Sequence, residues 1–317
     1  MNRETKYTYG PVPSRRLGFS LGVDIIPFKT CTFDCIYCQL GKTTNKTARR
    51  AEYTPAQDIV DEIRRVLTKH KHIDYLTFSG SGEPTLHSRL GYIISSIKKF
   101  SDIPVAVLTN GSLLTMADVR EDLSHADVVA PTLCGTASDI VQRINQPVSR
   151  ITSDTILQGL MDFRNGYTGD IWLEVMLIQD LNDTDEHIKR LAARIKKISP
   201  EKIHLNTVVR PPSDKNIRAV PLEKLRVIQN LLGERCEIIA GFDKKMSPTD
   251  LKNRRDDIMN VIKRRPVTLD DIVRVTGVHI QEAQKILDSL ISNNMIRFSE
   301  HNGHRYYEAM NRHATPG

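Results

Sequence analysis

The chain has 317 residues, of which 39% are hydrophobic, enough for one large domain or for a large and a small one. It has no apolar run near the ~20 residues that span a bilayer, no signal-peptide core, and only five cysteines, so we expect a soluble cytoplasmic protein without a disulfide framework. Its net charge is +7, and residues 1–50 carry nine Lys/Arg against three acidic residues. This excess fits either a solvated basic face or a surface for an anionic substrate.

The first predicted elements deliver the chain to a cysteine-rich loop. Residues 10–14 (GPVPS) are rich in turn formers, and residues 19–26 (FSLGVDII) have the β-branched and apolar composition of a strand. Cys31, Cys35 and Cys38 follow with the spacing C-x3-C-x2-C. Three thiols so close together lie on one irregular loop and point at one centre.

The chemistry of three such thiols favours an iron–sulfur cluster. Thiolates hold these clusters, and a cubane needs four iron ligands, so three cysteines leave one iron open. Two alternatives remain at this point. Structural zinc normally takes four closed ligands, and the thiols could also carry no metal.

The following 200 residues alternate between short apolar runs and amphipathic stretches. Buried strands separated by helices predict a parallel sheet with right-handed crossovers. Six strand–helix units are too few for a closed eight-stranded barrel, so we predict an α/β fold with a partial (β/α)6 TIM-like barrel. The predicted strands are 19–26, 73–78, 105–108, 127–133, 170–178 and 202–209, with an edge strand at 236–240, and the predicted helices are 57–70, 87–100, 115–124, 154–163, 183–198 and 222–232.

Polar loops follow several of these strands at the same edge. The cysteine loop, residues 80–84, residues 109–111 and residues 132–135 all come directly after a predicted strand. In parallel α/β folds the chemistry lies at the carboxyl ends of the strands. These loops therefore predict one shared site.

The pattern changes near residue 247, and we predict a first domain at residues 1–247 and a second at residues 248–317. The second has three helical stretches and two short strands, the order of a winged helix. Its charge of 11 Lys/Arg against 9 acidic residues is weak for binding phosphates, so a protein contact or a cover over the barrel is as plausible as nucleic-acid binding. The helices are expected at 251–263, 268–276 and 280–293, and the strands at 295–299 and 304–308.

Two motifs together resemble the signature of the radical S-adenosylmethionine (radical SAM) superfamily. The first is the C-x3-C-x2-C loop with Tyr37 before its last cysteine, and the second is residues 79–84 (SGSGEP), which resemble the Gly-Gly-Glu-Pro motif of that family with Ser81 in place of the first glycine. The resemblance covers roughly residues 10–243. Residues 10–24 (GPVPSRRLGFSLGVD) together with residues 31–41 (CTFDCIYCQLG) look closer still to an uncharacterised branch near the wybutosine-synthesis enzymes, whose additional N-terminal cysteines this chain lacks.

The resemblance implies a cofactor pair and a reaction. Cys31, Cys35 and Cys38 would hold a 4Fe-4S cluster, and S-adenosyl-L-methionine would bind the open iron. Reductive cleavage would give a 5′-deoxyadenosyl radical, with the electron coming from an external flavodoxin- or ferredoxin-like donor. The substrate class stays open between an RNA, a phosphorylated small molecule and a peptide.

The same resemblance assigns the S-adenosylmethionine contacts residue by residue. Glu83 and its neighbouring backbone would meet the methionyl ammonium. Ser81 and Gly82 would allow close approach of the backbone. Tyr37 would lie on the adenine side. The strand-end residues Thr109, Asn110 and Thr132 would contact the ribose or the methionyl carboxylate.

Several other residues are candidates on position alone. Glu174 lies mid-strand among apolar neighbours and is either paired in the interior or functional. Asn206 could face the barrel cavity. Cys134 and Cys236 are expected to be small buried residues.

We conclude from the sequence that the chain is a radical SAM enzyme with a C-terminal winged helix. The rival hypothesis is an iron–sulfur redox sensor that binds nucleic acid or protein through its winged helix and does not turn over. Glu83 and its loop distinguish the two, because a sensor needs no site for an ammonium group.

Overall fold

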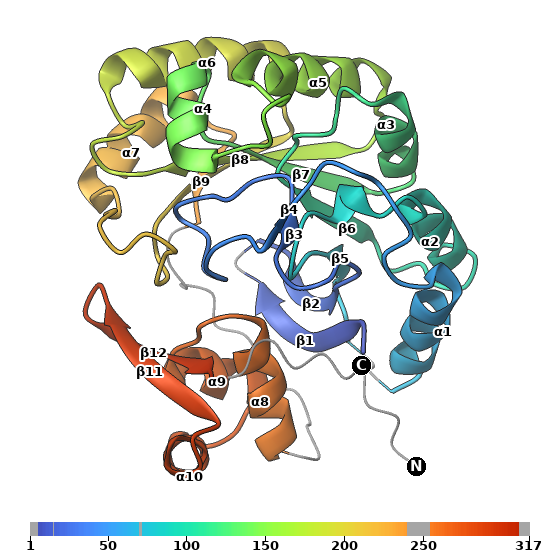
Figure 1. The fold of residues 1–317 in the computed structure, drawn as a ribbon, viewed down its shortest axis with the longest axis vertical. Coiled ribbons are helices and arrows are strands. Elements are labelled where there is room, and N and C mark those ends of the chain that lie inside the picture. The colour runs from blue at the N-terminus through green and yellow to red at the C-terminus, as the bar shows by residue number, and fades with distance from the viewer. Residues whose placement is uncertain (1–5, 15, 70–71, 240–253, 311–317) are drawn as a thin grey trace.

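A computed structural model describes residues 6–14, 16–69, 72–239 and 254–310. Its main element is one eight-stranded sheet with the order β1-β2-β5-β6-β7-β8-β9-β10 (Figure 1). The first strand, β1 (Thr8–Ser14), is antiparallel to its neighbour, and all other neighbours are parallel. The parallel strands are β2 (Gly18–Val23), β5 (Tyr75–Phe78), β6 (Val105–Thr109), β7 (Val128–Leu133), β8 (Asp170–Leu177), β9 (Lys202–Thr207) and β10 (Cys236–Ile238).

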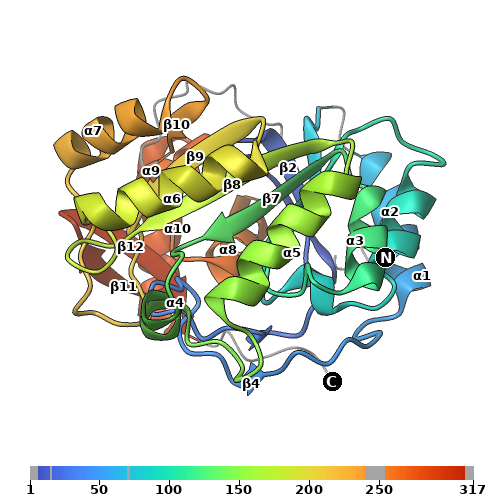
Figure 2. The same ribbon diagram turned by 90° about the horizontal axis from the view of Figure 1, so that it is seen from above.

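Helices cover one face of this sheet and leave the other concave (Figures 1 and 2). Alternation along β8 shows how the two faces divide, because Leu173 and Val175 pack in the large core with the helices, whereas Trp172 belongs to a separate cluster on the concave side. The helices are α1 (Ala56–Leu67), α2 (Leu90–Ile97), α3 (Ala117–Ser124), α4 (Ser138–Asn145), α5 (Ser153–Gly166), α6 (Asp185–Ile198) and α7 (Leu222–Leu232).

The partial barrel is confirmed, because the sheet has edges at β1 and β10 instead of closing. Apart from the two-residue strands β3 (Thr30–Cys31) and β4 (Asn45–Lys46) and the 3-10 helix Pro84–Leu86, two elements were missed in the sequence. Residues 8–14 form a strand and not only a turn, since an edge strand tolerates prolines that a central strand excludes. The short helix α4 also went unpredicted, although it proves important for the cysteine loop.

The C-terminal segment forms three helices and a hairpin around its own small core. That core includes Ile262, Ile272 and Leu287, one from each helix. The order of elements is the expected one, while the winged-helix assignment stays a prediction. The proposed boundary between residues 247 and 248 lies outside the described residues. The elements are α8 (Arg254–Arg264), α9 (Leu269–Thr276), α10 (Ile280–Ser292), β11 (Ile296–His301) and β12 (His304–Ala309).

This segment, here called the C-terminal unit (residues 254–310), contacts the barrel in two places. Helices α8 and α9 lie against β1, where Val12 packs on their core (Figure 1). In the loop after β9, the Tyr306 hydroxyl donates a 2.7 Å hydrogen bond to the carbonyl oxygen of Val209, and Asn302 Nδ2 donates to Val208 O at 3.2 Å. The unit therefore contacts the edge strand β1 and the loop that follows β9.

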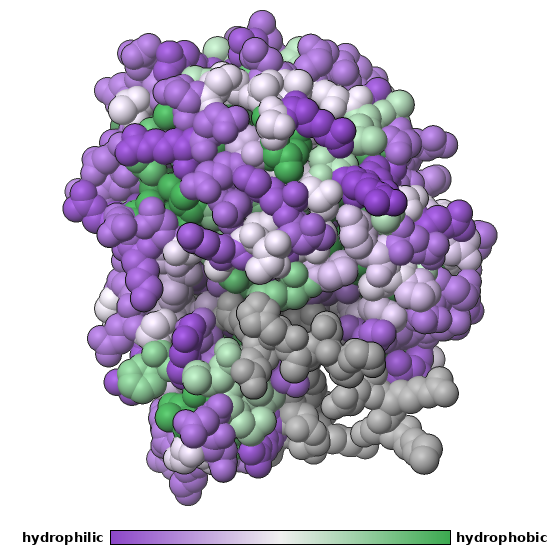
Figure 3. All heavy atoms as spheres, in the orientation of Figure 1, coloured by the Kyte–Doolittle hydropathy of each residue, from purple (hydrophilic) through white to green (hydrophobic). Residues whose placement is uncertain are grey.

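In the part of the chain that the structure describes, no helix is both long enough and apolar enough to cross a membrane. The face seen in Figure 3 is mainly hydrophilic, with small apolar patches.

Candidate active site

The cysteine loop begins directly after β2 and is closed at its base by a short parallel pair, β3 (Thr30–Cys31) with β4 (Asn45–Lys46). Its start is joined to the 79–84 loop by two backbone hydrogen bonds. Lys29 N donates to Ser81 O at 2.8 Å, and Glu83 N donates to Thr30 O at 3.3 Å. The two motifs that the sequence separates by 40 residues are thus one structural unit.

Helix α4 holds the other side of the cysteine loop. Its last carbonyl groups accept from the loop backbone, with Asp34 N donating to Asn145 O at 2.9 Å and Ile36 N donating to Ile144 O at 3.0 Å. Helix-end carbonyls lack partners inside the helix and are free for this role. The helix therefore ends where the loop needs acceptors.

Each of the three thiols accepts a hydrogen bond from a different side chain. Lys29 Nζ donates to Cys38 Sγ at 3.2 Å. Two amides serve the other sulfurs: Asn110 Nδ2 donates to Cys31 Sγ at 3.5 Å and Asn145 Nδ2 donates to Cys35 Sγ at 3.4 Å. Such donors stabilise negative charge on sulfur and are among the features that tune iron–sulfur centres.

Two of these thiols, those of Cys31 and Cys35, have raised pKa values. Burial raises the pKa of Cys31 to about 12, with a further contribution from the charge of Glu83, and burial raises the pKa of Cys35 well above its ordinary value. A centre that binds them as thiolates must displace these protons. Within the described residues, no three His, Cys, Asp or Glu side chains surround a single-ion position.

Glu83 is buried and connects the ends of β5 and β6. Its Oε1 accepts from the Thr109 hydroxyl at 2.6 Å and from both the hydroxyl and the backbone N–H of Thr85, and its Oε2 accepts from Asn110 N at 2.7 Å. Burial raises the pKa of the carboxyl, while these hydrogen bonds lower it. Three donors reach Oε1 and one reaches Oε2, so Glu83 holds the ends of β5 and β6 together while Oε2 keeps an acceptor site.

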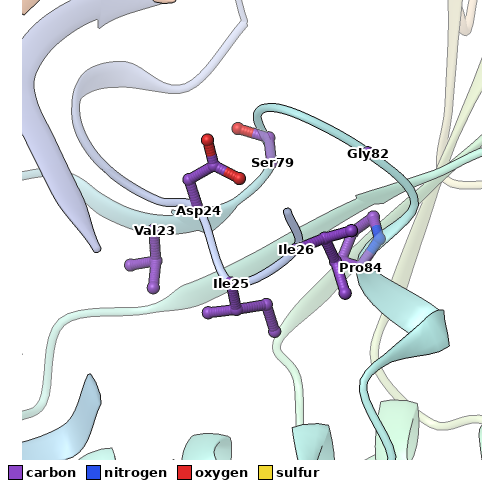
Figure 4. Close-up of a pocket in the computed structure, with 7 residues that line it drawn as sticks. All are labelled: Val23, Asp24, Ile25, Ile26, Ser79, Gly82 and Pro84. Carbon is purple, nitrogen blue, oxygen red and sulfur yellow. The ribbon is translucent and has the colours of Figure 1, made fainter. Parts of the chain in front are cut away.

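Ser81 and Gly82 also act through packing. The hydroxyl and backbone N–H of Ser81 both donate to the Asp24 carboxylate, at 2.6 and 3.0 Å. A β-carbon on Gly82 would overlap the carbonyl oxygen of Thr30 and lie 2.6 Å from Ile26 Cγ2. Figure 4 shows Ile26 next to Pro84, beneath the loop that carries Gly82. The glycine is therefore needed for contact between the two loops.

Tyr37 and Thr132 have partners on the β7–β8 side of the site. The Cys134 thiol donates to the Tyr37 hydroxyl at 3.4 Å, and burial raises the pKa of both groups, to about 11 for Cys134. Thr132 donates to Glu174 Oε2 at 3.3 Å. Cys134 is buried as expected, and so is Cys236.

Glu174 is paired in the interior, one of the two roles considered for it. Its Oε2 accepts from Arg16 at 2.9 Å, and its Oε1 accepts from Asn206 Nδ2 at 2.7 Å. Both partners of the ion pair are largely buried, with 12% and 13% of their side chains exposed. A polar cluster of Arg16, Thr132, Glu174 and Asn206 thus lies in the concave face of the sheet.

Sequence reasoning missed Lys29 and Asn145, which donate to the sulfurs. Lys29 lies only two residues before Cys31 in the sequence, but no spacing rule identifies a lysine there as a donor to a sulfur. Asn145 lies more than 100 residues away on the unpredicted helix α4. Only the folded structure brings it to Cys35.

The comparison with family models decides the family. Residues 25–195 match the model described as "Radical SAM superfamily". The chain belongs to the radical SAM superfamily. The matched range contains all three cysteines, the 79–84 loop and the strands β5 to β8.

Curated relatives of this radical SAM chain cover most of its length. The UPF0026 protein MJ1312 of Methanocaldococcus jannaschii is 37% identical over 90% of this chain and 87% of its own. A Brachyspira hyodysenteriae protein named "GTPase Obg" is 37% identical over 95% of this chain, which spans only 45% of that longer protein. The name of the longer protein therefore says nothing definite about the shared part.

Solved structures agree on the fold. A radical SAM methyltransferase from Sphaerobacter thermophilus superposes with a TM-score of 0.53 and 16% identity, over 69% of this chain and 66% of that one. SuiB of Streptococcus suis, in a structure with the precursor peptide SuiA bound, superposes with a TM-score of 0.52 and 14% identity, over 67% of this chain and 45% of that one.

The residues present fit a 4Fe-4S cluster. Three soft thiol ligands lie on one loop, each with an N–H donor directed at its sulfur. A further cysteine near them, Cys134, is buried and shares the Asn145 amide with Cys35. Of the five cysteines, the remaining two are buried in β10 and just after β7.

Proposed function

We propose that this chain is a radical SAM enzyme in which Cys31, Cys35 and Cys38 hold a 4Fe-4S cluster with one open iron. The observation that carries the proposal is the union of the cysteine loop with the Glu83 loop at the carboxyl ends of β2, β5 and β6. When bound and reduced, such a cluster would supply one electron to S-adenosyl-L-methionine, whose C5′–S bond would break to give methionine and a 5′-deoxyadenosyl radical. The electron comes from a flavodoxin- or ferredoxin-like donor.

The chain's own residues position the cofactors. Glu83 fixes Thr109 and Asn110 against the 79–84 loop, and Asn110 in turn reaches Thr32 Oγ1 at 2.7 Å and the sulfur of Cys31. The backbone carbonyls beside Ser81 and Gly82 receive the methionyl ammonium. Tyr37, on the opposite side of the loop, borders the adenine.

We further propose that the substrate reaches the radical from the concave side of the sheet. The polar cluster around Glu174 lies there, and Arg16 offers a fork of N–H donors of which one is used on Glu174. This arrangement suits a polar or anionic group of the substrate. RNA, a phosphorylated small molecule and a peptide all carry such groups.

The basic residues of the first segment divide into two sets. Arg50 is committed to Asp118 and Asp122, and Lys29 to Cys38, so neither is available to an external anion. Among the described residues, the exposed set is Lys6 and, beside the cysteine loop, Lys42, Lys46 and Arg49. If RNA is the substrate, replacing Lys42 and Arg49 by glutamine reduces the slope of log affinity against log salt by about 1–2, measured by anisotropy with a labelled oligonucleotide. Unchanged or salt-independent binding removes RNA from the candidates.

Metal analysis and electron paramagnetic resonance (EPR) test the function. Anaerobically reconstituted protein should contain four irons and four sulfides, and the EPR signal of the reduced cluster should change when S-adenosylmethionine is added. Cys35→Ala should lose the cluster, and Cys236→Ala, which removes a buried thiol far from the loop, should keep it.

The same spectra separate the enzyme from its rivals. A reduced cluster whose EPR signal does not change when S-adenosylmethionine is added would support the redox-sensor hypothesis. Colourless protein containing zinc would contradict the cluster itself.

The C-terminal unit, with its contacts to β1 and to the loop after β9, is proposed to form a wall of the barrel that positions the substrate.

A further inference from the structure

Lys29 differs from the other two sulfur donors in carrying a charge. Its side chain donates to Cys38 Sγ at 3.2 Å, whereas Cys31 and Cys35 receive neutral amide donors. The residue is only 3% exposed. Lysine is almost never so buried unless its charge has a partner.

The backbone of Lys29 is held as firmly as its side chain. Its N–H donates to Ser81 O, and its carbonyl oxygen accepts from the backbone N–H groups of Thr44 and Asn45, at 3.2 and 3.1 Å. Its φ is +57°, in the left-handed region that a lysine rarely adopts. Such a conformation persists where surrounding contacts over-determine it, and here these contacts come from both motif loops.

We propose that Lys29 is a positioning residue that sets the reduction potential of the cluster by placing a buried positive charge against the sulfur of Cys38. This rests on the proposed function, because it requires a cluster on the three thiols. A cluster held by three thiolates is net negative, and it becomes more negative when it accepts an electron from the donor. A fixed cation beside one thiolate favours the reduced state.

Burial makes this charge effective. An exposed cation is screened by water and salt, whereas one in the interior is screened much less. Lys42 provides the comparison within the same loop, because it is exposed and carries the same charge. The effect should therefore belong to position 29 and not to the basic character of the loop.

A redox titration followed by EPR tests the proposal on the full-length reconstituted protein. Lys29→Gln keeps an N–H group near Cys38 but removes the charge, and it should disfavour reduction at least tenfold at a fixed potential, a downward shift of the midpoint by about 59 mV for one electron. Lys29→Arg keeps the charge and should stay near the wild-type midpoint. Lys42→Gln, the matched control, should also leave the midpoint unchanged.

Two results would overturn the inference. The first is a wild-type midpoint in Lys29→Gln with its cluster fully loaded. The second is loss of the cluster from both Lys29→Gln and Lys29→Arg while Lys42→Gln retains it, which would assign Lys29 to packing alone. If Lys29→Gln alone loses the cluster and Lys29→Arg keeps it with a normal midpoint, the charge requirement is supported. Wild-type protein that assembles no cluster would instead refute the proposed function.

Discussion

Substitution of Gly82 by alanine tests how the two motif loops depend on each other. The added β-carbon would overlap the carbonyl oxygen of Thr30 and lie 2.6 Å from Ile26 Cγ2, whereas ordinary contact begins at 3.4 Å. Ile26 must therefore move by about 0.8 Å, and the Thr30 carbonyl, which is backbone next to Cys31, must move farther. The predicted result is separation of the 79–84 loop from the cysteine loop.

The cost follows from what the separation breaks. Overpacking of a well-packed site typically costs about 1–3 kcal/mol. The hydrogen bonds from Glu83 N to Thr30 O and from Lys29 N to Ser81 O lie across the same contact, at about 0.5–1.5 kcal/mol each. We therefore expect Gly82→Ala to reduce the free energy of unfolding by about 2–6 kcal/mol.

Urea unfolding followed by circular dichroism measures this loss, and iron content after reconstitution measures its effect on the site. The control is Gly166→Ala, at the exposed end of α5, where an added β-carbon meets nothing within 4 Å. A Gly82→Ala protein with the stability and iron content of Gly166→Ala would refute the reasoning, because it would show that the loops can separate without cost.

Three further predictions follow from single contacts. Arg50→Ala should lower the free energy of unfolding by about 3 kcal/mol, measured with urea, because it breaks the largely buried ion pair between Arg50 and Asp122. Arg49→Ala, at an exposed side chain, should change this free energy by less than about 0.5 kcal/mol. Equal effects of the two variants would contradict a stabilising role for the Arg50 ion pair. Tyr306→Phe should lower the free energy of unfolding by about 0.5–1.5 kcal/mol through loss of its bond to Val209 O, and a neutral result would argue against that contact. Burial raises the pKa of the Cys134 thiol to about 11, so native protein should resist alkylation at Cys134 at pH 8 and react faster as the pH rises toward 11. Mass spectrometry measures the labelling. Rapid labelling of Cys134 at pH 8 would contradict the prediction, because it would show an accessible and ionised thiol.

Local patterns were enough to predict most of the barrel. Long periodic segments such as α6 and α7 and short apolar runs such as β6 and β7 lie within a few residues of their predicted bounds. Strand β1 could not be foreseen, because Gly10, Pro11 and Pro13 indicate a turn by local rules, and only an edge position makes them compatible with a strand.

The candidate site, like the fold, was predicted only in part from the sequence. Motif spacing placed the three cysteines and the Glu83 loop together, and the structure brings those loops into direct contact. The side chains that donate to the sulfurs could not be predicted from the sequence, because Asn145, which donates to Cys35, is 110 residues away from it in the chain. Nor could the sequence tell that Glu83 would bond to Thr109 and Asn110, since this depends on how two strand ends meet.

The measurement that tests the central claim most directly is formation of 5′-deoxyadenosine. Anaerobically reconstituted protein is reduced with dithionite, given S-adenosyl-L-methionine, and assayed by chromatography. The account predicts slow product formation by the wild type and by Cys236→Ala, and none by Cys35→Ala. A wild-type protein with a fully loaded cluster that forms no 5′-deoxyadenosine would contradict it.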